Sequence, residues 1–459
     1  MASQSKIINT NQGNFFKTGK TKTIAYRRTA LKRLKKIIER REDDICDALY
    51  TDFKKPKFES LVSETQFALA ELNHILANLE LWAKPKKVGS SLGSFPSKDW
   101  IQYEPFGSVL VISPWNYPFM LAISPLVGAV AAGNTVVLKP SELSPATSKI
   151  LAEIISEAFA PDHVTVLEGG VEVAQELLEV KWDYIFFTGS TQVGKIIYES
   201  AAKHLTPVTL ELGGKNPCIV DETTSLSVAA KRITWGKLLN AGQTCLAPDY
   251  ILVHQSIKEP LIEEIKKTII QFYGKDVEKS EHLARIATTN QYNRLKEMLK
   301  DETVIWGGDF NDDDQFIAPT LLDSPSMDSL VMQDEIFGPI LPLFGYENEE
   351  EIDEYIASFG KPLALYVFSK RRKFQKKMMK NYSFGGGVIN DCVLHIANKK
   401  MPFGGVGNSG FGGYHGIHSF QLFSHKKSIL KKPFLFDIPV RYPPYRLSET
   451  IVKKLKNFL

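Results

Sequence analysis

Residues 107–139 read GSVLVISPWNYPFMLAISPLVGAVAAGNTVVLK, and this stretch decides the fold class. Two short runs of β-branched and apolar residues, 108–112 and 135–138, stand on either side of a longer apolar run at 119–133. Each short run has the length of a buried strand. The longer run is interrupted by a serine and a proline and is too short to cross a bilayer, so it predicts a buried helix.

The same alternation of strand and helix continues toward the C-terminus. Further strands are predicted in HVTVLEGG, DYIFFTG and PVTLELGG, with helical segments between them such as STQVGKIIYESAAKH at 190–204. Short apolar strands that alternate with helices predict an α/β fold in which helices cover both faces of a parallel sheet. Ligands bind at the carboxyl ends of the strands in such sheets, so the residues after each strand are the candidates for a site.

The chain on the N-terminal side of this stretch has a different residue pattern and composition. Residues 22–81 place apolar side chains at helical spacing and predict a helical scaffold. From 84 to 105 the chain is rich in Gly, Ser, Pro and Lys and ends in the alternating DWIQYEP, which predicts an extended arm. Such an arm can add strands across the subunits of an oligomer. With 459 residues, the chain is long enough for two or three domains.

The composition is that of an ordinary globular protein. The chain is 43% hydrophobic and 24% charged, and its net charge of +4 is mixed with 52 acidic residues, which argues against nucleic acid as a partner. Four cysteines without a CxxC pair and an N-terminus without a signal-peptide pattern predict a reduced, cytoplasmic setting. We expect no transmembrane segment. The C-terminal SETIVKKLKNFL at 448–459 is basic and amphipathic, which is compatible with packing on a partner or with contact at a membrane surface.

Polar side chains follow the first two predicted strands. Asn116 comes after the first, where its amide could donate a hydrogen bond to a developing oxyanion. Asn beside an aromatic residue and a proline is also a common turn residue. Lys139 and Glu142 follow the second strand and could bind ribose oxygens, whereas Ser141 and Glu142 could equally form the cap and first turn of a helix. The pattern alone leaves both interpretations open.

Residues 189–195, GSTQVGK, open a predicted helix after a later strand. A helix N-terminus of this kind offers backbone N–H groups to a pyrophosphate. The segment lacks the GxGxxG pattern of dinucleotide-binding proteins and nearly matches the GxxxxGK phosphate loop. The next residue is Ile196, so the hydroxyl that would hold Mg²⁺ in a nucleotide hydrolase is missing. Nucleotide hydrolysis is therefore a minor alternative.

A carboxylate and a thiol form the strongest candidate for chemistry. Glu211 ends the predicted strand in VTLELGG, and Cys245 lies in the loop NAGQTC. A thiolate is a strong nucleophile, and a partly desolvated glutamate can take a proton from water. They are distant in the sequence, so only tertiary structure can bring them together. No carboxylate or cysteine beside His415, His418 and His425 completes a metal site, and we expect none.

Seven segments, in this order, resemble the aldehyde dehydrogenase superfamily: PWNYP, LKPSE, FTGSTQVG, LELGGKNP, GQTCLAPDY, QDEIFGPILP and MPFGGVGNSGFGGYHG. The combination of GQTC with LELGG is the most specific part. GQTCLAPDY and VGNSGFGGYHGIHSFQLFSH are similar to the class 3 branch. The resemblance implies a Rossmann-like NAD(P)-binding domain (1–82 and 103–210), an α/β catalytic domain (211–415), and an oligomerisation arm with a C-terminal segment (83–102 and 416–459). A class 3 relative is expected to be a homodimer.

The resemblance also implies roles for single residues. Cys245 matches the nucleophile, Glu211 the base that activates water, and Asn116 the donor to the oxyanion. The positions that match contacts to the dinucleotide are Lys139, Glu142, Gly189, Ser190, Val193, Gly194, Leu212, Glu335 and Phe337. The aldehyde pocket would draw on Tyr117, Trp235 and Leu239, which are apolar or aromatic and suit medium or long aliphatic or aromatic aldehydes.

The implied reaction is NAD(P)-dependent oxidation of an aldehyde to the carboxylic acid. It passes through a thiohemiacetal and a thioester on Cys245, and water activated by Glu211 hydrolyses the thioester. Glu142 disfavours a 2′-phosphate by charge repulsion, so NAD⁺ is the expected cofactor, with NADP⁺ also accepted as in class 3 relatives. The alternative outside this chemistry is a catalytically silent protein that binds a dinucleotide or has a structural role.

Overall fold

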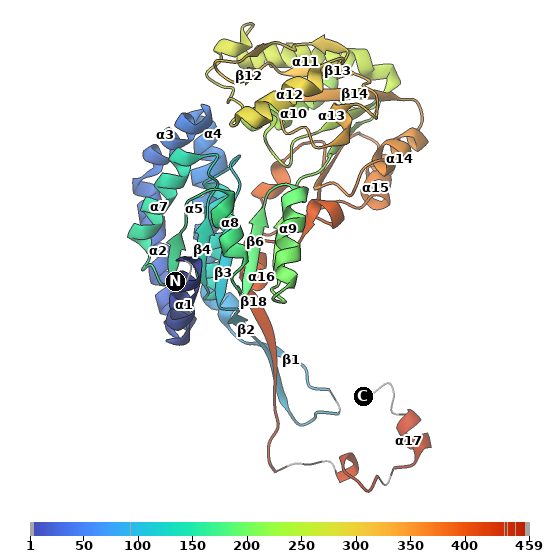
Figure 1. The fold of residues 1–459 in the computed structure, drawn as a ribbon. Coiled ribbons are helices and arrows are strands. Elements are labelled where there is room, and N and C mark those ends of the chain that lie inside the picture. The colour runs from blue at the N-terminus through green and yellow to red at the C-terminus, as the bar shows by residue number, and fades with distance from the viewer. Residues whose placement is uncertain (1–3, 92, 436, 438, 446, 455–459) are drawn as a thin grey trace.

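The computed structural model describes residues 4–91, 93–435, 437, 439–445 and 447–454. Two sheets of mainly parallel strands form the body of the molecule, and a narrow antiparallel arm extends from it (Figure 1). The α/β class predicted from the alternation of strands and helices is confirmed.

The first sheet has six strands in the order β17-β7-β6-β3-β4-β5. They are β3 (Ser108–Ile112), β4 (Thr135–Lys139), β5 (Val164–Val166), β6 (Tyr184–Thr188), β7 (Val208–Glu211) and β17 (Gly410–Phe411). Neighbouring strands are parallel from β5 to β7, and β17 runs antiparallel to β7. The helices around this sheet are α5 (Gln66–Ala83), α6 (Met120–Ala132), α7 (Pro145–Ala158), α8 (Val171–Leu178) and α9 (Thr191–Ala202).

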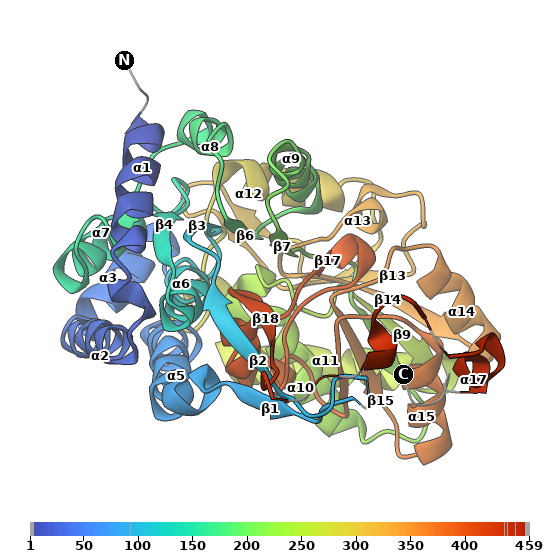
Figure 2. The same ribbon diagram turned by 90° about the horizontal axis from the view of Figure 1, so that it is seen from below.

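Alternate side chains of β3 enter two separate cores. Val109 and Val111 pack in the core that includes α6, whereas Leu110 and Ile112 pack in a second core with side chains of α8 and α9. In Figure 2, α8 and α9 lie above the strands of this sheet, and α5 and α6 lie below them. Every residue of α6 is buried, which explains its uniformly apolar sequence.

The predicted helical scaffold at 22–81 is confirmed. The helices that precede α5 are α1 (Gln4–Lys17), α2 (Ile24–Arg40), α3 (Glu42–Phe53) and α4 (Lys57–Ser60). Helix α2 buries Leu31, Leu34 and Ile38 along one face, as their helical spacing requires. Between α4 and α5 the chain makes a π-helical turn, Leu61–Thr65. Such turns are rare and occur frequently at functional sites.

The second sheet has seven strands in the order β10-β13-β14-β9-β8-β15-β16, parallel except for β10. Its strands are β8 (Pro217–Val220), β9 (Tyr250–His254), β10 (Val304–Trp306), β13 (Thr320–Asp323), β14 (Ile340–Tyr346), β15 (Ala364–Phe368) and β16 (Gly386–Ile389). A small hairpin joins β11 (Phe310–Asn311) and β12 (Phe316–Ile317). The helices of this part are α10 (Leu226–Leu238), α11 (Lys258–Tyr273), α12 (Thr289–Leu299), α13 (Leu330–Gln333), α14 (Glu349–Ala357) and α15 (Arg372–Asn381).

The arm consists of β1 (Lys86–Val88), β2 (Lys98–Pro105) and β18 (Ser424–Lys431), so the predicted extended segment is confirmed. Strands β2 and β18 pair along their whole length. Helix α16 (Ile417–Leu422) precedes β18, and the predicted amphipathic C-terminal segment contains α17 (Glu449–Lys454). Its last residues, 455–459, lie outside the described residues. Within the ranges that the structure describes, no helix is both long enough and apolar enough to cross a membrane.

Strand β17 belongs to the range 211–415, which the sequence predicts as the catalytic domain, yet it hydrogen-bonds to β7 of the first sheet. Gly410 pairs with Glu211, and a Cβ atom on Gly410 would lie 1.9 Å from the carbonyl oxygen of Leu210. Because Gly410 also has a φ of +115°, only glycine fits this crossing. The chain therefore returns from the second sheet to the first directly beside Glu211.

Candidate active site

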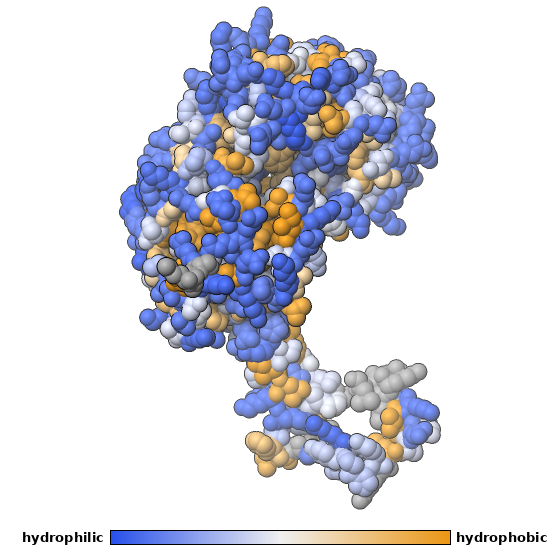
Figure 3. Space-filling view, in the orientation of Figure 1, coloured by the Kyte–Doolittle hydropathy of each residue, from blue (hydrophilic) through white to orange (hydrophobic). Residues whose placement is uncertain are grey.

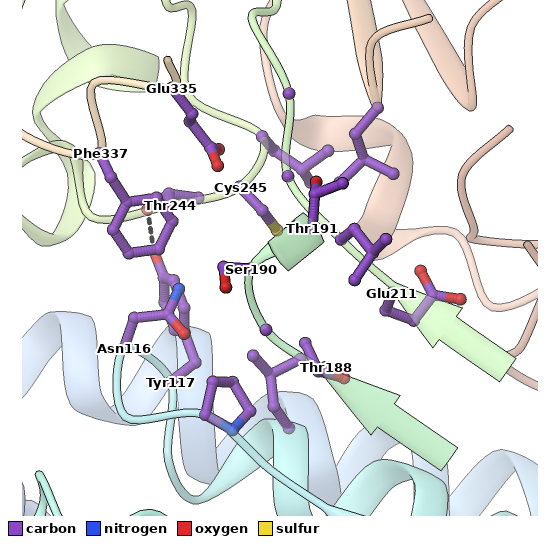
Figure 4. Close-up of a pocket in the computed structure, with 18 of the residues that line it drawn as sticks. Asn116, Tyr117, Thr188, Ser190, Thr191, Glu211, Thr244, Cys245, Glu335 and Phe337 are labelled. Carbon is purple, nitrogen blue, oxygen red and sulfur yellow. Dashed lines mark hydrogen bonds between the residues drawn. The ribbon is translucent and has the colours of Figure 1, made fainter. Parts of the chain in front are cut away.

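A cavity of about 630 Å³ lies where segments from both sheets meet (Figure 4). Parts of its wall follow β3, β6 and β7, within 114–117, 188–192 and 211–215. Other parts lie within 239–246 and 333–337. The cavity lies at the carboxyl ends of these parallel strands, where the sequence predicts a site.

Cys245 reaches this cavity from a tight loop after α10. Asn240 and Ala241 have left-handed φ values of 56° and 53°, which are costly for residues other than glycine. Gly242 follows at a φ of +76°, and a Cβ atom there would lie 2.2 Å from the carbonyl oxygen of Gly338. The loop that carries the thiol is thereby pressed against the loop that carries Glu335.

The thiol of Cys245 is partly exposed on the cavity wall. Burial raises its pKa above the ordinary range, and the charges of Glu335 and Glu211 raise the pKa further. The backbone N–H groups of Cys245 and Leu246 act in the opposite direction. The free protein therefore holds Cys245 as the protonated thiol at neutral pH.

This raised pKa predicts how alkylation of Cys245 depends on pH. Only the thiolate reacts with iodoacetamide, so we expect slow modification of Cys245 at neutral pH and a rate that still rises above about pH 10, where an ordinary thiol has levelled off. Mass spectrometry of the Cys245 peptide measures the rate, with glutathione as the unshifted reference. A rate profile that superimposes on that of glutathione would contradict the raised pKa.

Glu211, the last residue of β7, lines the same cavity and is 3% exposed. Burial raises the pKa of its carboxyl well above the usual value. Neither carboxyl oxygen has a hydrogen-bond partner among the described residues. In Figure 4 the carboxyl group points away from the sulfur of Cys245. No hydrogen bond to the described residues opposes a rotation of this side chain toward the thiol.

Asn116 connects the end of β3 to the thiol loop. Its Nδ2 donates to the carbonyl oxygen of Gln243 at 2.9 Å, and the Nδ2 of Asn240 donates to the carbonyl oxygen of Asn116 at 2.8 Å. The next residue, Tyr117, shares a hydrogen bond of 2.7 Å with the hydroxyl of Thr244. The side-chain amide is thus tied to the loop that carries the Cys245 thiol.

Glu335 lines the cavity from the loop against which the thiol loop packs. Its carboxyl sits against the backbone of Gly213, where a Cβ atom would lie 1.8 Å from Oε2. Burial raises its pKa to about 8, and Asp249 adds to this shift. Phe337 has a left-handed φ of 55°, and its carbonyl oxygen accepts a hydrogen bond of 2.9 Å from Gln291. Both residues line the cavity, as the resemblance implies.

The N-terminus of α9 forms another part of the wall. Gly189 and Ser190 line the cavity, and the Ser190 hydroxyl caps the helix by accepting from the Val193 N–H at 3.3 Å. A Cβ atom on Gly194 would lie 2.8 Å from Leu212, so this glycine lets α9 pack onto the leucine that lines the cavity. The predicted segment therefore presents a capped helix N-terminus to the cavity.

Some predicted site residues lie outside the cavity wall. Among the described residues, the wall excludes Lys139, Glu142, Val193, Gly194 and Trp235. Lys139 and Glu142 lie at the end of β4, where their charged groups are 2.5 Å apart. Trp235, which the sequence analysis placed in the aldehyde pocket, does not line the cavity. It is 37% exposed because α10 buries Thr234, Gly236 and Leu238 and turns this position to solvent.

Tyr117 and Leu239, the two other predicted pocket residues, line the cavity. The structure adds wall residues that the sequence analysis missed, namely Ser63, Phe67, Met120, Leu121, Val393, Ile396, Phe403 and Tyr414. Ser63 and Phe67 come from the π-helical turn and α5, where the pattern indicated only scaffold. Tyr414 could have been suspected, because it lies in the glycine-rich GGYHG segment.

The other cysteines and His415 are buried packing residues, whereas His418 is partly buried and His425 is exposed. Cys46, Cys218 and Cys392 are buried. His415 is 1% exposed and stacks on Tyr414 with ring centroids 4.1 Å apart. No group of three or more metal-ligating side chains occurs in the part of the chain that the structure describes.

Comparison with known proteins agrees with this geometry. Residues 6–429 match the sequence model of the aldehyde dehydrogenase family. The chain is 46% identical over 434 residues to 4,4′-diaponeurosporen-aldehyde dehydrogenase of Staphylococcus aureus, covering 94% of this chain and 95% of that protein. It is 44% identical over 431 residues to a dog enzyme named aldehyde dehydrogenase, dimeric NADP-preferring, with coverages of 94% and 95%.

A solved structure gives the same answer for the fold. The substrate-bound state of Staphylococcus aureus AldH superposes with a TM-score of 0.97 at 44% identity, and the match covers 99% of this chain and 100% of that one. Sequence and fold agree over nearly the whole length. The chain belongs to the aldehyde dehydrogenase family, the enzymes that oxidise aldehydes to carboxylic acids.

Proposed function

We propose that Cys245 is the nucleophile, Asn116 an oxyanion donor and Glu211 the base in the oxidation of an aldehyde to its acid. The observation that carries this proposal is the convergence of the three side chains, from three separate segments, on one cavity. A thiol, an amide donor and a buried carboxyl are the groups that chemistry through an acyl-enzyme needs.

Each step uses one of these groups. The Cys245 thiol passes its proton to solvent water as its sulfur adds to the aldehyde carbon, and the resulting alkoxide accepts hydrogen bonds from Asn116 and the Cys245 N–H, each such donor lowering the barrier by about 3 kcal/mol. A bound nicotinamide supplies the acceptor for the hydride that leaves this carbon. Glu211 then takes a proton from water as the water oxygen attacks the thioester, and the carbon–sulfur bond breaks to release the acid and the thiol.

The shifted pKa of Glu211 suits this role. A carboxylate with an ordinary pKa is a weak base toward water, whereas one that burial has raised toward the working pH takes a proton more readily. The carboxyl has no hydrogen-bond partner to break among the described residues before it turns to a water molecule.

The cavity fits a nicotinamide dinucleotide. The N-terminus of α9 would hold the pyrophosphate through its backbone N–H groups, with Gly189 and Ser190 beside it. Glu335 and Phe337 would flank the nicotinamide ribose, and Leu212 would lie under the ring. Outside the cavity, apolar side chains of α8 and α9 gather on the surface (Figure 3), among them Val171 and Val193, which are 63% and 42% exposed. This patch suits an adenine ring.

Lys139 and Glu142 would bind the adenosine ribose. The Glu142 carboxylate repels a 2′-phosphate, so we propose NAD⁺ as the preferred cofactor, with NADP⁺ also accepted. The NADP preference in the name of the dog relative supports the second half of this proposal.

Replacing Glu142 by glutamine is expected to raise kcat/KM for NADP⁺ relative to NAD⁺ about 10-fold, because it removes one repulsive charge near a phosphate and frees Lys139 to pair with that phosphate. Steady-state kinetics with both cofactors measures the ratio. Glu153→Gln is the matched control, since Glu153 pairs with Arg41 and does not line the cavity. An unchanged cofactor ratio in Glu142→Gln would contradict the assignment.

The substrate is proposed to be a medium or long aliphatic or an aromatic aldehyde. Apolar and aromatic side chains line the cavity around Cys245, including Phe67, Met120, Leu121 and Phe403. The polyene-derived aldehyde in the name of the Staphylococcus aureus relative supports an extended apolar substrate.

We further propose a homodimer, a cytoplasmic location and the domain division given above. The projecting arm of β1, β2 and β18 supports association of two chains, as does the word dimeric in the name of the dog enzyme. A reduced thiol at Cys245 and a supply of dinucleotide are both needed for the chemistry, which supports the cytoplasm. The two parallel sheets support the division into a dinucleotide-binding and a catalytic domain.

The test is a turnover assay of the purified protein with a fatty or aromatic aldehyde and NAD⁺, followed by the absorbance of NADH. A catalytically silent protein would bind the dinucleotide without forming NADH. A nucleotide hydrolase would release phosphate from ATP without any aldehyde. Aldehyde-dependent NADH formation is the expected result and excludes both alternatives.

A further inference from the structure

The short segment 55–64 buries ionisable side chains next to the site. Lys55 and Glu64 are both 0% exposed, and their charged groups are 2.7 Å apart. Glu59 lies between them on α4 and is partly buried. A buried ion pair costs desolvation energy and is weak evidence for stability, so its position requires another explanation.

Lys55 and Glu64 hold the segment that carries Asn116. One oxygen of Glu64 accepts hydrogen bonds from the N–H groups of Phe119 and Met120, at 3.1 and 2.8 Å. These groups begin α6, where a carboxylate is also favoured by the helix dipole. The ammonium of Lys55 lies 3.9 Å from the centre of the Tyr117 ring. The ion pair thus contacts and fixes residues 117–120, directly on the C-terminal side of Asn116.

Glu59 holds the loop that carries Cys245. Its Oε2 accepts the backbone N–H of Asn240 at 3.0 Å. Asn240 and Ala241 form the left-handed turn that aims the following residues at the cavity, and such a turn persists only where its surroundings hold it. Tyr117 and Thr244, hydrogen-bonded at 2.7 Å, link the two held segments to each other.

We propose that Lys55, Glu59 and Glu64 are positioning residues. They hold Asn116 and the Cys245 loop in the relative position that lets both donate hydrogen bonds to the oxyanion. The inference rests on the proposed roles of Cys245 and Asn116. None of the three touches the reacting atoms; Glu59 acts through Asn240, and the ion pair acts through Tyr117 and the start of α6. Loosening either contact moves one donor relative to the other, and a misplacement of about 1 Å can cost a factor on the order of 100 in rate.

Three variants on α4 test the role of Glu59. Glu59→Ala removes the acceptor for the Asn240 N–H and is expected to lower the rate of the NADH burst about 10-fold to 100-fold, with KM for NAD⁺ changed less than about 3-fold. Glu59→Gln keeps an acceptor oxygen and is expected to restore the burst to within about 3-fold of the parent. Lys57→Ala is the matched control, because Lys57 is 62% exposed and pairs only with Asp43 among the charged groups described.

The pH profile gives a second readout. Burial raises the pKa of Glu59 to about 7, while Lys55 and the Asn240 N–H lower it. Tyr117 and Tyr273 also face this carboxyl. As pH falls through the pKa, Glu59 is protonated and accepts more weakly, so the burst should slow on the acid side in the parent. Glu59→Gln cannot titrate and should lose this part of the pH dependence.

Hydrogen exchange of segment 239–247 tests the proposal without turnover. Glu59→Ala should speed exchange there, whereas Lys57→Ala should not. Should Glu59→Ala prove unstable, the double variant Lys55→Met with Glu64→Gln removes both charges together and should slow the burst in the same way. Equal burst rates and equal exchange in Glu59→Ala and Lys57→Ala overturn the proposal. A parent enzyme without aldehyde turnover but with the expected change in exchange overturns the proposed function instead.

Discussion

Replacing Cys245 by alanine is expected to reduce aldehyde-dependent NADH formation to the background of the assay. The substitution removes the sulfur that forms the covalent bond, and no other thiol can take its place, since Cys218 and Cys392 are fully buried. Loss of a nucleophile of this kind lowers kcat by factors on the order of 10⁴ or more. Steady-state turnover with an excess of aldehyde and NAD⁺ measures the loss.

Two controls make this result specific. Cys46→Ala removes a thiol on α3 that does not line the cavity and should keep the parent rate. Binding of the dinucleotide to Cys245→Ala, measured by calorimetry, should remain, because the thiol contributes little to holding the cofactor. Turnover in Cys245→Ala equal to that of the parent would refute the assignment of the nucleophile.

Replacing Glu211 by glutamine is expected to separate the two halves of the reaction. The amide cannot take a proton from water, so hydrolysis of the thioester should slow by a factor of about 100 or more, within the range for loss of a general base. Addition of Cys245 and departure of the hydride do not need this base. Stopped-flow absorbance should therefore show one equivalent of NADH per active site, followed by a steady state close to zero.

A second carboxyl on the cavity wall, that of Glu335, provides a comparison for this test. Glu335 has a pKa raised to about 8 by burial and is the other group that could accept a proton there. Its glutamine variant is expected to weaken cofactor binding and thus raise KM for NAD⁺, without a burst that stops after one turnover. If Glu335→Gln instead gave the isolated burst and Glu211→Gln turned over normally, the base would be Glu335.

A lost burst in Glu211→Gln would point to a different error. Glu211 contributes to the raised pKa of Cys245, so the neutral amide should make the thiolate easier to form rather than harder. A burst that is absent, in a protein whose thermal unfolding is unchanged, would mean that Glu211 acts before the thioester forms.

The three residues proposed to carry the chemistry could be selected from the sequence, because each stands in a distinctive local pattern and the family resemblance supplies its expected role. Glu211 ends an apolar strand shortly before two glycines, Cys245 lies in a loop opened by Gly242, and Asn116 lies in the segment after the first strand. The position of a residue at the end of a parallel strand already places it at the edge of the sheet where ligands bind. The proposed cofactor segment at 189–194 followed from the same rule.

The residues that shape the cavity could not be predicted in this way. Trp235 shares an apolar character with Tyr117 and Leu239, but the rotation of α10 turns it to solvent. Ser63 and Phe67 lie in the stretch predicted only as a helical scaffold. The spacing of apolar side chains along a helix shows which face is buried, and it does not show what packs against that face. Likewise, nothing in the sequence around Lys55 and Glu64 distinguishes them from charged surface residues, although they form a buried ion pair.

The sequence by itself determined the α/β class, the helical N-terminal scaffold, the extended arm and the identity of the thiol, amide and carboxyl at the site, because strand and helix periodicity and the residues at strand ends are local properties of the chain. Only the tertiary structure decided that Glu211 is buried without a hydrogen-bond partner among the described residues and that the Glu335 carboxyl packs against Gly213. It also decided that segment 55–64 hydrogen-bonds both to the segment after Asn116 and to the Cys245 loop. Burial, and the pKa shifts that follow from it, depend on which distant segments pack together, and no local pattern carries that information.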